Sequence, residues 1–262
     1  MKQQKKQITL EERKAIQLDM LTEIDAFCKE NMIKYSLAFG TLLGAIRHKG
    51  FIPWDDDVDI MMPLPDMLRF KAGFKSEKLK YCDVDTEPHY EFAFSRISYN
   101  PTYNQKGIAC KSYGISIDLY PVVALPDSED ERKYYFEKGS KLNNIRYKYM
   151  KWRRWIIQRI PISTIIGHDK SIRKARDFVV MNTPKYGSTS VFFVVATLFS
   201  KKDKLIHDID LFDEIVTVPF EDRFYDITAH YQVFLSKMYG DYMTPPPEKD
   251  RHPYHGGHYY WK

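Results

Sequence analysis

Residues 39–61 read FGTLLGAIRHKGFIPWDDDVDIM. The first half predicts a strand at 35–39, a break at Gly40 and a short apolar helix that Thr41 can cap. The free backbone N–H groups and the dipole at such a helix N-terminus favour a phosphate, and the Thr41 hydroxyl can donate to it. A Gly-Thr pair before a helix is more often an ordinary cap, so this half alone is weak evidence for a phosphate site.

The second half carries aspartates at the alternate positions Asp55, Asp57 and Asp59. Alternate side chains of a strand share one face, so a strand at 57–61 would bring these carboxylates together. Such carboxylates repel one another, and a hard divalent cation removes the conflict by binding carboxylate and substrate phosphate oxygens together. The alternative is a solvated acidic turn. The apolar residues around the aspartates favour a strand that enters the core, where uncompensated acids are costly.

A third carboxylate is expected on a neighbouring strand. Asp118 lies within a run of apolar β-formers, 115–120. A lone buried Asp usually bonds a backbone turn or an Arg, but with Asp57 and Asp59 it completes a site for in-line phosphoryl transfer. We therefore predict that Asp57, Asp59 and Asp118 are the catalytic and metal-binding residues and that they hold Mg²⁺ or Mn²⁺. Asp118 can bind the metal or accept the proton of the attacking hydroxyl.

Two basic residues follow the predicted phosphate turn. The Arg47 guanidinium can fork onto a phosphate oxygen, and His48 can add positive charge. The alternative for Arg47 is a surface salt bridge with an Asp, and the alternative for His48 is simple solvation.

The rest of the chain predicts a mixed α/β (α+β) architecture, a small mixed sheet flanked by helices. A capping box at 9–12 and apolar residues at helical spacing predict a helix over 10–30. Short β-branched and aromatic runs within 81–119 predict further strands, and Pro121 and Pro126 are expected to close that region. With 44% apolar residues, the chain of 262 residues can bury a core.

Charge is unevenly distributed along the chain. Of the net +5, residues 132–176 hold 14 Lys and Arg against two acids, a net +12, so the remainder carries −7. Helices are predicted over 142–156, 171–182 and 228–238, and the apolar run 191–199 fits a strand or a helix. We predict three segments: a nucleotidyltransferase-like catalytic core at 1–127, a basic helical insertion at 128–200, and a C-terminal segment at 201–262 that completes the catalytic domain.

The basic insertion has two interpretations. Its cations, interleaved with Trp152 and Trp155, suit an anionic membrane surface or an acidic glycan. The alternative is a helical subdomain that packs its apolar stripe on the core and solvates its charges. Nucleic acid is a poorer partner, because no recognised binding motif accompanies the charge. The polar start at 1–14 and the three scattered Cys predict a reduced, cytoplasmic protein without a secretory signal, with a peripheral place on the inner membrane face under the first interpretation.

The stretch 37–61 closely resembles the LicD family, whose motif reads much like GTLLGAxRHxGxIPWDDDxDI. Residues 117–121, IDLYP, resemble the second motif of the family, and residues 239–246, YGDYMTPP, resemble its C-terminal segment. The likeness therefore spans most of the chain, although 128–200 is only loosely covered. It implies a fold of the nucleotidyltransferase superfamily.

The resemblance also implies a reaction: transfer of a phospho-alcohol from a CDP-linked donor to a sugar hydroxyl of a glycan, possible acceptors being a cell-surface glycan and its lipid-linked precursor. CDP-choline is the donor most associated with bacterial members, and CDP-ribitol and CDP-glycerol are variants. By position, Asp57 and Asp59 match the metal-binding pair of the family, Asp118 its third acid, Gly40 and Thr41 its phosphate turn, and Arg47 and His48 positions near the donor. Two other functions stay open: a nucleotidyltransferase that moves a nucleoside monophosphate to a small acceptor, and a non-catalytic scaffold of the same fold.

Overall fold

The computed structural model describes residues 6–87, 90, 92, 94–104, 113–157, 167–195, 202–252 and 257–262. Within these ranges, the side chains of 146, 147, 149–157, 167–172 and 202 lie outside the description. The chain divides into two compact units. The first unit comprises Met1–Tyr81, Arg96–Tyr120 and Leu211–Lys262, and the second comprises Cys82–Ser95 and Pro121–Asp210.

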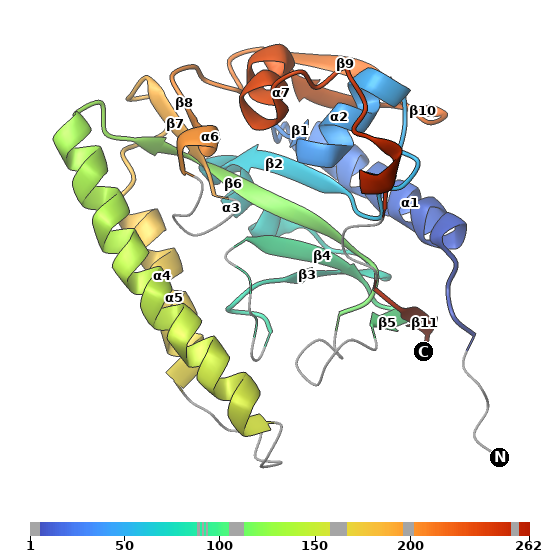
Figure 1. Cartoon of the computed structure of the whole chain (residues 1–262), viewed down its shortest axis with the longest axis horizontal. Helices are drawn as coiled ribbons and strands as arrows, with labels where there is room; N and C mark the ends of the chain where they lie inside the picture. Colours follow the sequence, from blue (N-terminus) through green and yellow to red (C-terminus); the bar gives the residue numbers. More distant parts are fainter. Residues whose placement is uncertain are drawn as a thin grey trace. The chain divides into compact units, whose positions relative to one another are not determined.

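A seven-stranded sheet organises the fold, with the strand order β1-β2-β6-β4-β3 (Figure 1). Its other two strands follow from β6, because β7 pairs with β6 and β8 pairs with β7. The strands are β1 (Ser36–Leu37), β2 (Asp59–Pro63), β3 (Leu79–Cys82), β4 (Ser95–Tyr99), β6 (Ser116–Leu125), β7 (Val191–Val194) and β8 (Ile206–His207). All of β2 and all but the first residue of β6 are buried, so these two strands form the middle of the core. The predicted α/β class is confirmed.

In the first unit, helices and a hairpin surround β1 and β2. The helices are α1 (Leu10–Glu30), α2 (Phe39–His48), α3 (Leu64–Gly73), α7 (Tyr231–Tyr239) and a 3₁₀ turn, η1 (Glu248–Asp250); the hairpin is β9 (Ile215–Phe220) with β10 (Arg223–Thr228). Helix α2 packs against β1, β2, β9 and α7. A small antiparallel pair, β5 (Thr102–Asn104) with β11 (Tyr259–Trp261), brings the C-terminal segment to this unit.

Helix α1 forms as its sequence predicts. The Thr9 side chain accepts from the Glu12 N–H, and the Glu12 side chain accepts from the Thr9 N–H, which completes the capping box. One face of the helix, including Leu21, Ile24 and Cys28, is fully buried. The predicted helix over 10–30 is confirmed.

The second unit contains two long helices that run beside each other, α4 (Glu129–Ile157) and α5 (Gly167–Met181), and the short α6 (Lys202–Leu205) (Figure 1). The ambiguous run at 191–199 starts as strand β7, because its four residues pair with the end of β6 and are all buried. The helical spacing of 142–156 also predicts that Ile145 lies on a packed apolar stripe. Ile145 is 48% exposed, so the prediction is wrong for this residue. Within the described part of the chain, no helix combines the length and the apolar character needed to cross a bilayer.

Several element boundaries differ from the predictions. Strand β1 covers only two residues of the predicted 35–39, because Phe39, at φ 46°, turns the chain directly into α2. The N-cap of α2 is Ala38, so Thr41 is not the cap. The strand that was predicted to end at Pro121 continues to Leu125 as β6. The Pro121 carbonyl accepts from the Val195 N–H (2.9 Å), so Pro121 takes part in the pairing with the next strand. The helix predicted over 228–238 begins at Tyr231 instead, because Thr228 is the last residue of strand β10.

Some predictions lie outside the described residues. These are a strand at 108–110, the end of a helix at Pro161, and the apolar or aromatic side chains of Tyr149, Trp152, Trp155 and Ile156.

Candidate active site

The aspartate run lies in the loop between α2 and β2, rather than on the strand itself. Strand β2 begins at Asp59, so Asp55 and Asp57 precede it. Helix α1 holds this loop through two neighbouring cations. Arg13 forms a buried ion pair with Asp56 (2.9 Å), and Lys14 donates to the carbonyls of Ile52 (3.2 Å) and Pro53 (3.1 Å). Asp56 is therefore paired with Arg13, while one of its carboxylate oxygens stays close to those of Asp55 and Asp57.

The tip of the β9–β10 hairpin fixes the other end of this loop. The Glu221 N–H donates to the carbonyl of Lys49 (2.8 Å), and the Glu221 carboxylate accepts from the Phe51 N–H (2.8 Å). Gly50 lies between these bonds, and a Cβ there would collide with the Glu221 carboxylate. The loop is thus attached to α1 at one end and to the hairpin at the other, which sets the place of the aspartates between them.

Carboxylates converge at the end of this loop. One oxygen each of Asp55, Asp56 and Asp57 lies within 4.8 Å of the others. Burial, followed by the charge of Asp57, raises the pKa of Asp55 to about 7. Burial also raises the pKa of Asp59 well above its usual range, and the charges of Asp57, Asp118 and Asp55 add to the effect. Among the described residues, Asp55 and Asp59 form no ion pair.

Asp59 is fixed by three hydrogen bonds. Its N–H donates to the Thr41 hydroxyl (2.9 Å), and its carbonyl accepts from the Ala38 N–H (2.9 Å). The Tyr120 hydroxyl donates to the Asp59 carboxylate (3.3 Å). Thr41 therefore acts as a bridge from α2 to the strand in this structure, and its hydroxyl already accepts one bond.

Asp118 lies beside this cluster on the adjacent strand β6. Its N–H donates to the carbonyl of Val58 (3.0 Å), which places it next to Asp59 across the sheet. Arg96, on β4, makes a forked ion pair with its two carboxylate oxygens, at 2.6 and 2.9 Å. The charges of Asp57 and Asp118 both act on Asp59, so the three predicted residues lie near one another, but Asp118 is paired with Arg96. Among the described residues, the group whose oxygens all lie within 4.8 Å is Asp55, Asp56 and Asp57, and it includes neither Asp59 nor Asp118.

A close contact explains why position 40 holds a glycine. A Cβ at this position would come within 2.6 Å of a carboxylate oxygen of Asp55. In this structure the close approach that Gly40 allows is therefore that of Asp55, and the first turn of α2 lies against the acidic cluster. A carboxylate near a helix N-terminus is favoured by the helix dipole.

Arg47 and His48 end α2 beside an aromatic side chain that the sequence interpretation missed. Arg47 donates to the carbonyl of Tyr242 (2.7 Å) and forms no ion pair with a described residue. The His48 ring meets Trp54 edge-on at 6.1 Å, and the Arg251 guanidinium lies 5.3 Å from the centre of the Trp54 ring. Burial and the charge of Arg251 lower the pKa of Arg47. Burial and Arg47 lower that of His48. Cationic side chains therefore gather around Trp54.

The donor atoms of the acidic cluster fit a hard divalent cation. All are carboxylate oxygens, the ligands that Mg²⁺ and Mn²⁺ prefer. A cation there would balance the charges of Asp55, Asp57 and Asp59. Burial, followed by the mutual repulsion of these carboxylates, raises the pKa of Asp55 and Asp59. Tyr120 was missed, although it lies two residues after Asp118 and so on the same face of β6. Arg96 was also missed. The one feature of the sequence that could have indicated it is a cation within the short strand at 95–99.

Comparisons with known proteins give the family that this chain resembles. Residues 32–127 match the family model described as LicD/FKTN/FKRP, nucleotidyltransferase domain. The chain is 28% identical to the lipopolysaccharide cholinephosphotransferase LicD of Haemophilus influenzae, over 95% of this chain and 97% of that protein. It is also 27% identical to an uncharacterized protein of Rickettsia typhi, over 68% of this chain and 60% of that protein. The resemblance to the LicD family that the motifs indicate is confirmed, by the family model over residues 32–127 and by the Haemophilus influenzae relative over nearly the whole chain.

Proposed function

We propose that this protein transfers a phospho-alcohol, with phosphocholine as the first candidate, from a CDP-linked donor to a sugar hydroxyl of a glycan, with release of CMP. The acceptor is a cell-surface glycan or its lipid-linked precursor. Support comes from the relative named a lipopolysaccharide cholinephosphotransferase, which aligns over nearly the whole chain.

One observation carries the proposal: burial and the neighbouring carboxylates raise the pKa of both Asp55 and Asp59, beside Asp57, which is the environment that a bound cation would relieve. Asp57 and Asp59, with Asp55 and Asp118 at their sides, would hold Mg²⁺ or Mn²⁺. Bound there, the ion would neutralise the negative charge of the donor diphosphate.

The side chains around the cluster position these carboxylates. Tyr120 orients Asp59 through its hydroxyl, and Arg96 orients Asp118 through its fork. A carboxylate oxygen that accepts one N–H keeps a second lone pair. The ion pair thus leaves Asp118 able to bind the metal or to accept the proton of the acceptor hydroxyl.

The cationic side chains Arg47 and Arg251 suit the departing nucleotide. Arg47 spends one N–H on the carbonyl of Tyr242 and keeps further donors for a phosphate oxygen. Arg251 adds positive charge near Trp54, whose ring offers a flat surface for a base and meets the His48 ring edge-on. Arg47 therefore has two roles in the proposal, to tie the C-terminal segment to α2 and to hold the donor.

The test is incubation of the protein with CDP-choline, CDP-ribitol or CDP-glycerol and Mg²⁺, with product analysis by chromatography. Free CMP from one donor, lost on chelation and in the Asp59→Asn variant, is the expected result. Asp222→Asn is the matched control, because Asp222 lies in the hairpin turn with its side chain 77% exposed. Release of pyrophosphate from a nucleoside triphosphate would instead favour a nucleotidyltransferase. Metal-independent release, or full activity of Asp59→Asn, would refute the assignment.

A further inference from the structure

The segment 239–246 begins with a tyrosine at the end of α7. Tyr239 is the last residue of this helix, about one turn after the fully buried Leu235. A residue and the one four positions later lie on the same side of a helix, so the Tyr239 ring extends from the packed side of α7. The residue is still 42% exposed, which leaves part of the ring open to a ligand.

Aromatic contacts tie α7 to the acidic cluster. The ring of Phe39, the first residue of α2, lies 5.5 Å from that of Phe234 on α7 and 5.0 Å from that of Tyr120. The Tyr120 hydroxyl in turn donates to the Asp59 carboxylate. Helix α7 therefore packs, through one ring, against the strand residue that orients Asp59.

The turn that follows α7 ties the same end of the helix to Arg47. Directly after Tyr239, Gly240 has a φ of 71°, a conformation that favours glycine, and it turns the chain sharply. Two residues later the Tyr242 carbonyl accepts from Arg47 (2.7 Å). Tyr239 is thus held between a contact that leads to Asp59 and a contact to Arg47.

The surroundings of the Tyr239 hydroxyl agree with this placement. Partial burial raises the pKa of this group, and the charges of Asp59, Asp55 and Asp57 add to the effect, whereas the charge of Arg47 opposes it. A phenol is protonated at neutral pH and can donate one hydrogen bond. Among the described residues, none accepts a hydrogen bond from the Tyr239 hydroxyl, so a ligand can take it.

We propose that Tyr239 is a donor-binding residue, whose hydroxyl donates to a phosphate oxygen of the donor diphosphate between the metal-binding aspartates and Arg47. A diphosphate that touches both a cation on the aspartates and the Arg47 guanidinium has to occupy the space between them. A hydroxyl that donates to an anionic oxygen there forms a charge-assisted hydrogen bond. This inference rests on the proposed function, because it needs a diphosphate at that site.

The test is calorimetric titration of the full chain with CDP in the presence of Mg²⁺. Tyr239→Phe keeps the ring and removes only the hydroxyl, so its Tm should stay that of the wild type. Its Kd for CDP should rise roughly tenfold, because a hydrogen bond to a charged group is lost. Its Kd for Mg²⁺ alone should stay unchanged, since the hydroxyl is assigned to the phosphate and not to the metal.

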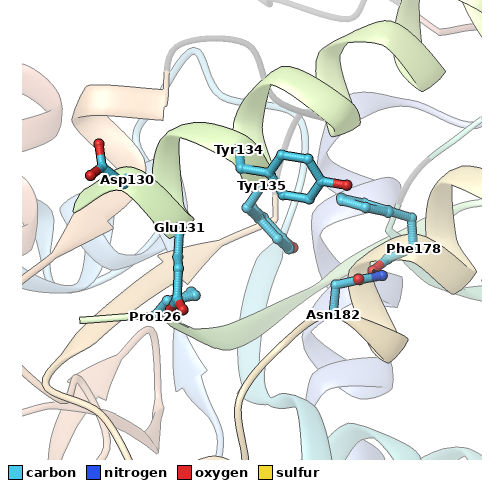
Figure 2. A pocket seen from close by; sticks show the side chains of 7 residues that line it. All are labelled: Pro126, Asp130, Glu131, Tyr134, Tyr135, Phe178 and Asn182. Atoms are coloured by element: carbon cyan, nitrogen blue, oxygen red, sulfur yellow. Dashed lines mark hydrogen bonds between the residues drawn. The ribbon is translucent and has the colours of Figure 1, made fainter. Parts of the chain in front are cut away.

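A matched tyrosine and a second ligand control this test. Tyr134 is 59% exposed and lines a pocket of about 350 Å³ in the second unit (Figure 2). Tyr134→Phe removes the same hydroxyl from an exposed ring and should leave the Kd of CDP unchanged. Inorganic pyrophosphate with Mg²⁺ should show the same difference between the wild type and Tyr239→Phe as CDP does, because the contact does not involve the nucleoside.

The outcomes separate this inference from the proposed function. Equal CDP affinity of the wild type and Tyr239→Phe would overturn the inference alone. A weaker Mg²⁺ affinity of Tyr239→Phe would also overturn it, because the hydroxyl would then serve the carboxylates, and so would a loss limited to CDP and absent for pyrophosphate. CDP binding by the wild type that does not depend on Mg²⁺ would overturn the proposed function and this inference together.

Discussion

At the scale of single residues, a change to alanine should affect metal affinity at one glycine of α2 and stability at another. In Gly40→Ala the new Cβ meets the end of the Asp55 side chain at 2.6 Å, and this carboxylate can swing away. In Gly44→Ala the Cβ meets the backbone carbonyl of Gly50, which cannot move without the loop. We expect Gly40→Ala to keep its Tm but to lose Mg²⁺ affinity tenfold or more. Gly44→Ala should lose about 1–3 kcal/mol of stability through overpacking.

Thermal melts and Mg²⁺ calorimetry on both variants check this prediction. The steric account of Gly40 is wrong if Gly40→Ala binds Mg²⁺ as the wild type does.

The same scale shows what the sequence could predict about the site. Spacing indicated that Asp57, Asp59 and Asp118 lie near one another, and the charges of Asp57 and Asp118 do act on Asp59, although Asp57 precedes the strand on which the spacing placed it. The roles of these residues stay a prediction. The partners were not predictable, since the fork of Arg96 on Asp118 and the bond of Tyr120 to Asp59 depend on which strands pair and in which register.

At the scale of elements, α1 helps to hold the aspartate loop at 49–58 through one buried ion pair. The side chains of Arg13 and Asp56 are only 8% and 3% exposed. Arg13→Met or Asp56→Leu alone leaves a buried charge without its partner and should cost roughly 3–5 kcal/mol. The double variant removes both charges, so its cost should be well below the sum of the two. Urea unfolding of the four proteins gives the coupling energy. Additive single costs would show that the pair does not hold the loop.

Elements differ in how far local sequence decides them. Helix α1 was predictable because the capping box at Thr9 and a long apolar face act within the helix itself. The two-residue β1 and the start of β2 were not, because Phe39 turns the chain and the pairing of the sheet selects Asp59 as the first strand residue. Short elements follow their tertiary contacts more than their propensity.

At the scale of the whole molecule, charge is separated along the chain, with +12 over 132–176 and −7 elsewhere. If the basic residues meet an anionic membrane, as a lipid-linked acceptor would require, the protein should sediment with vesicles in proportion to their anionic lipid content. The effect should disappear near 0.5 M salt, because screening shortens the reach of each charge. Sedimentation that ignores the anionic fraction would contradict the membrane interpretation. The three-segment division at 127 and 200 stays a prediction.

The stability of the whole protein should also reveal the function of its acidic cluster. Above pH 7 the folded chain keeps Asp55 ionised among buried carboxylates, whereas the unfolded chain keeps it in water at no cost. Asn has the same shape and can still accept the Asp56 N–H, as Asp55 does now (3.1 Å). Asp55→Asn should therefore raise the metal-free stability by roughly 1–3 kcal/mol, or several degrees of Tm.

The response to Mg²⁺ should change in the opposite sense. A cation that binds only the folded chain stabilises it by mass action, so the wild type should gain Tm with Mg²⁺ and Asp55→Asn should gain much less. Thermal melts in EDTA and across a Mg²⁺ series measure both effects, with Asp222→Asn as the exposed control. A cluster that serves only the fold would give the reverse pattern, because removing one of its charges would then lower the metal-free Tm. The repulsion among these aspartates is a cost that the folded chain bears without metal, and binding of a divalent ion would offset it.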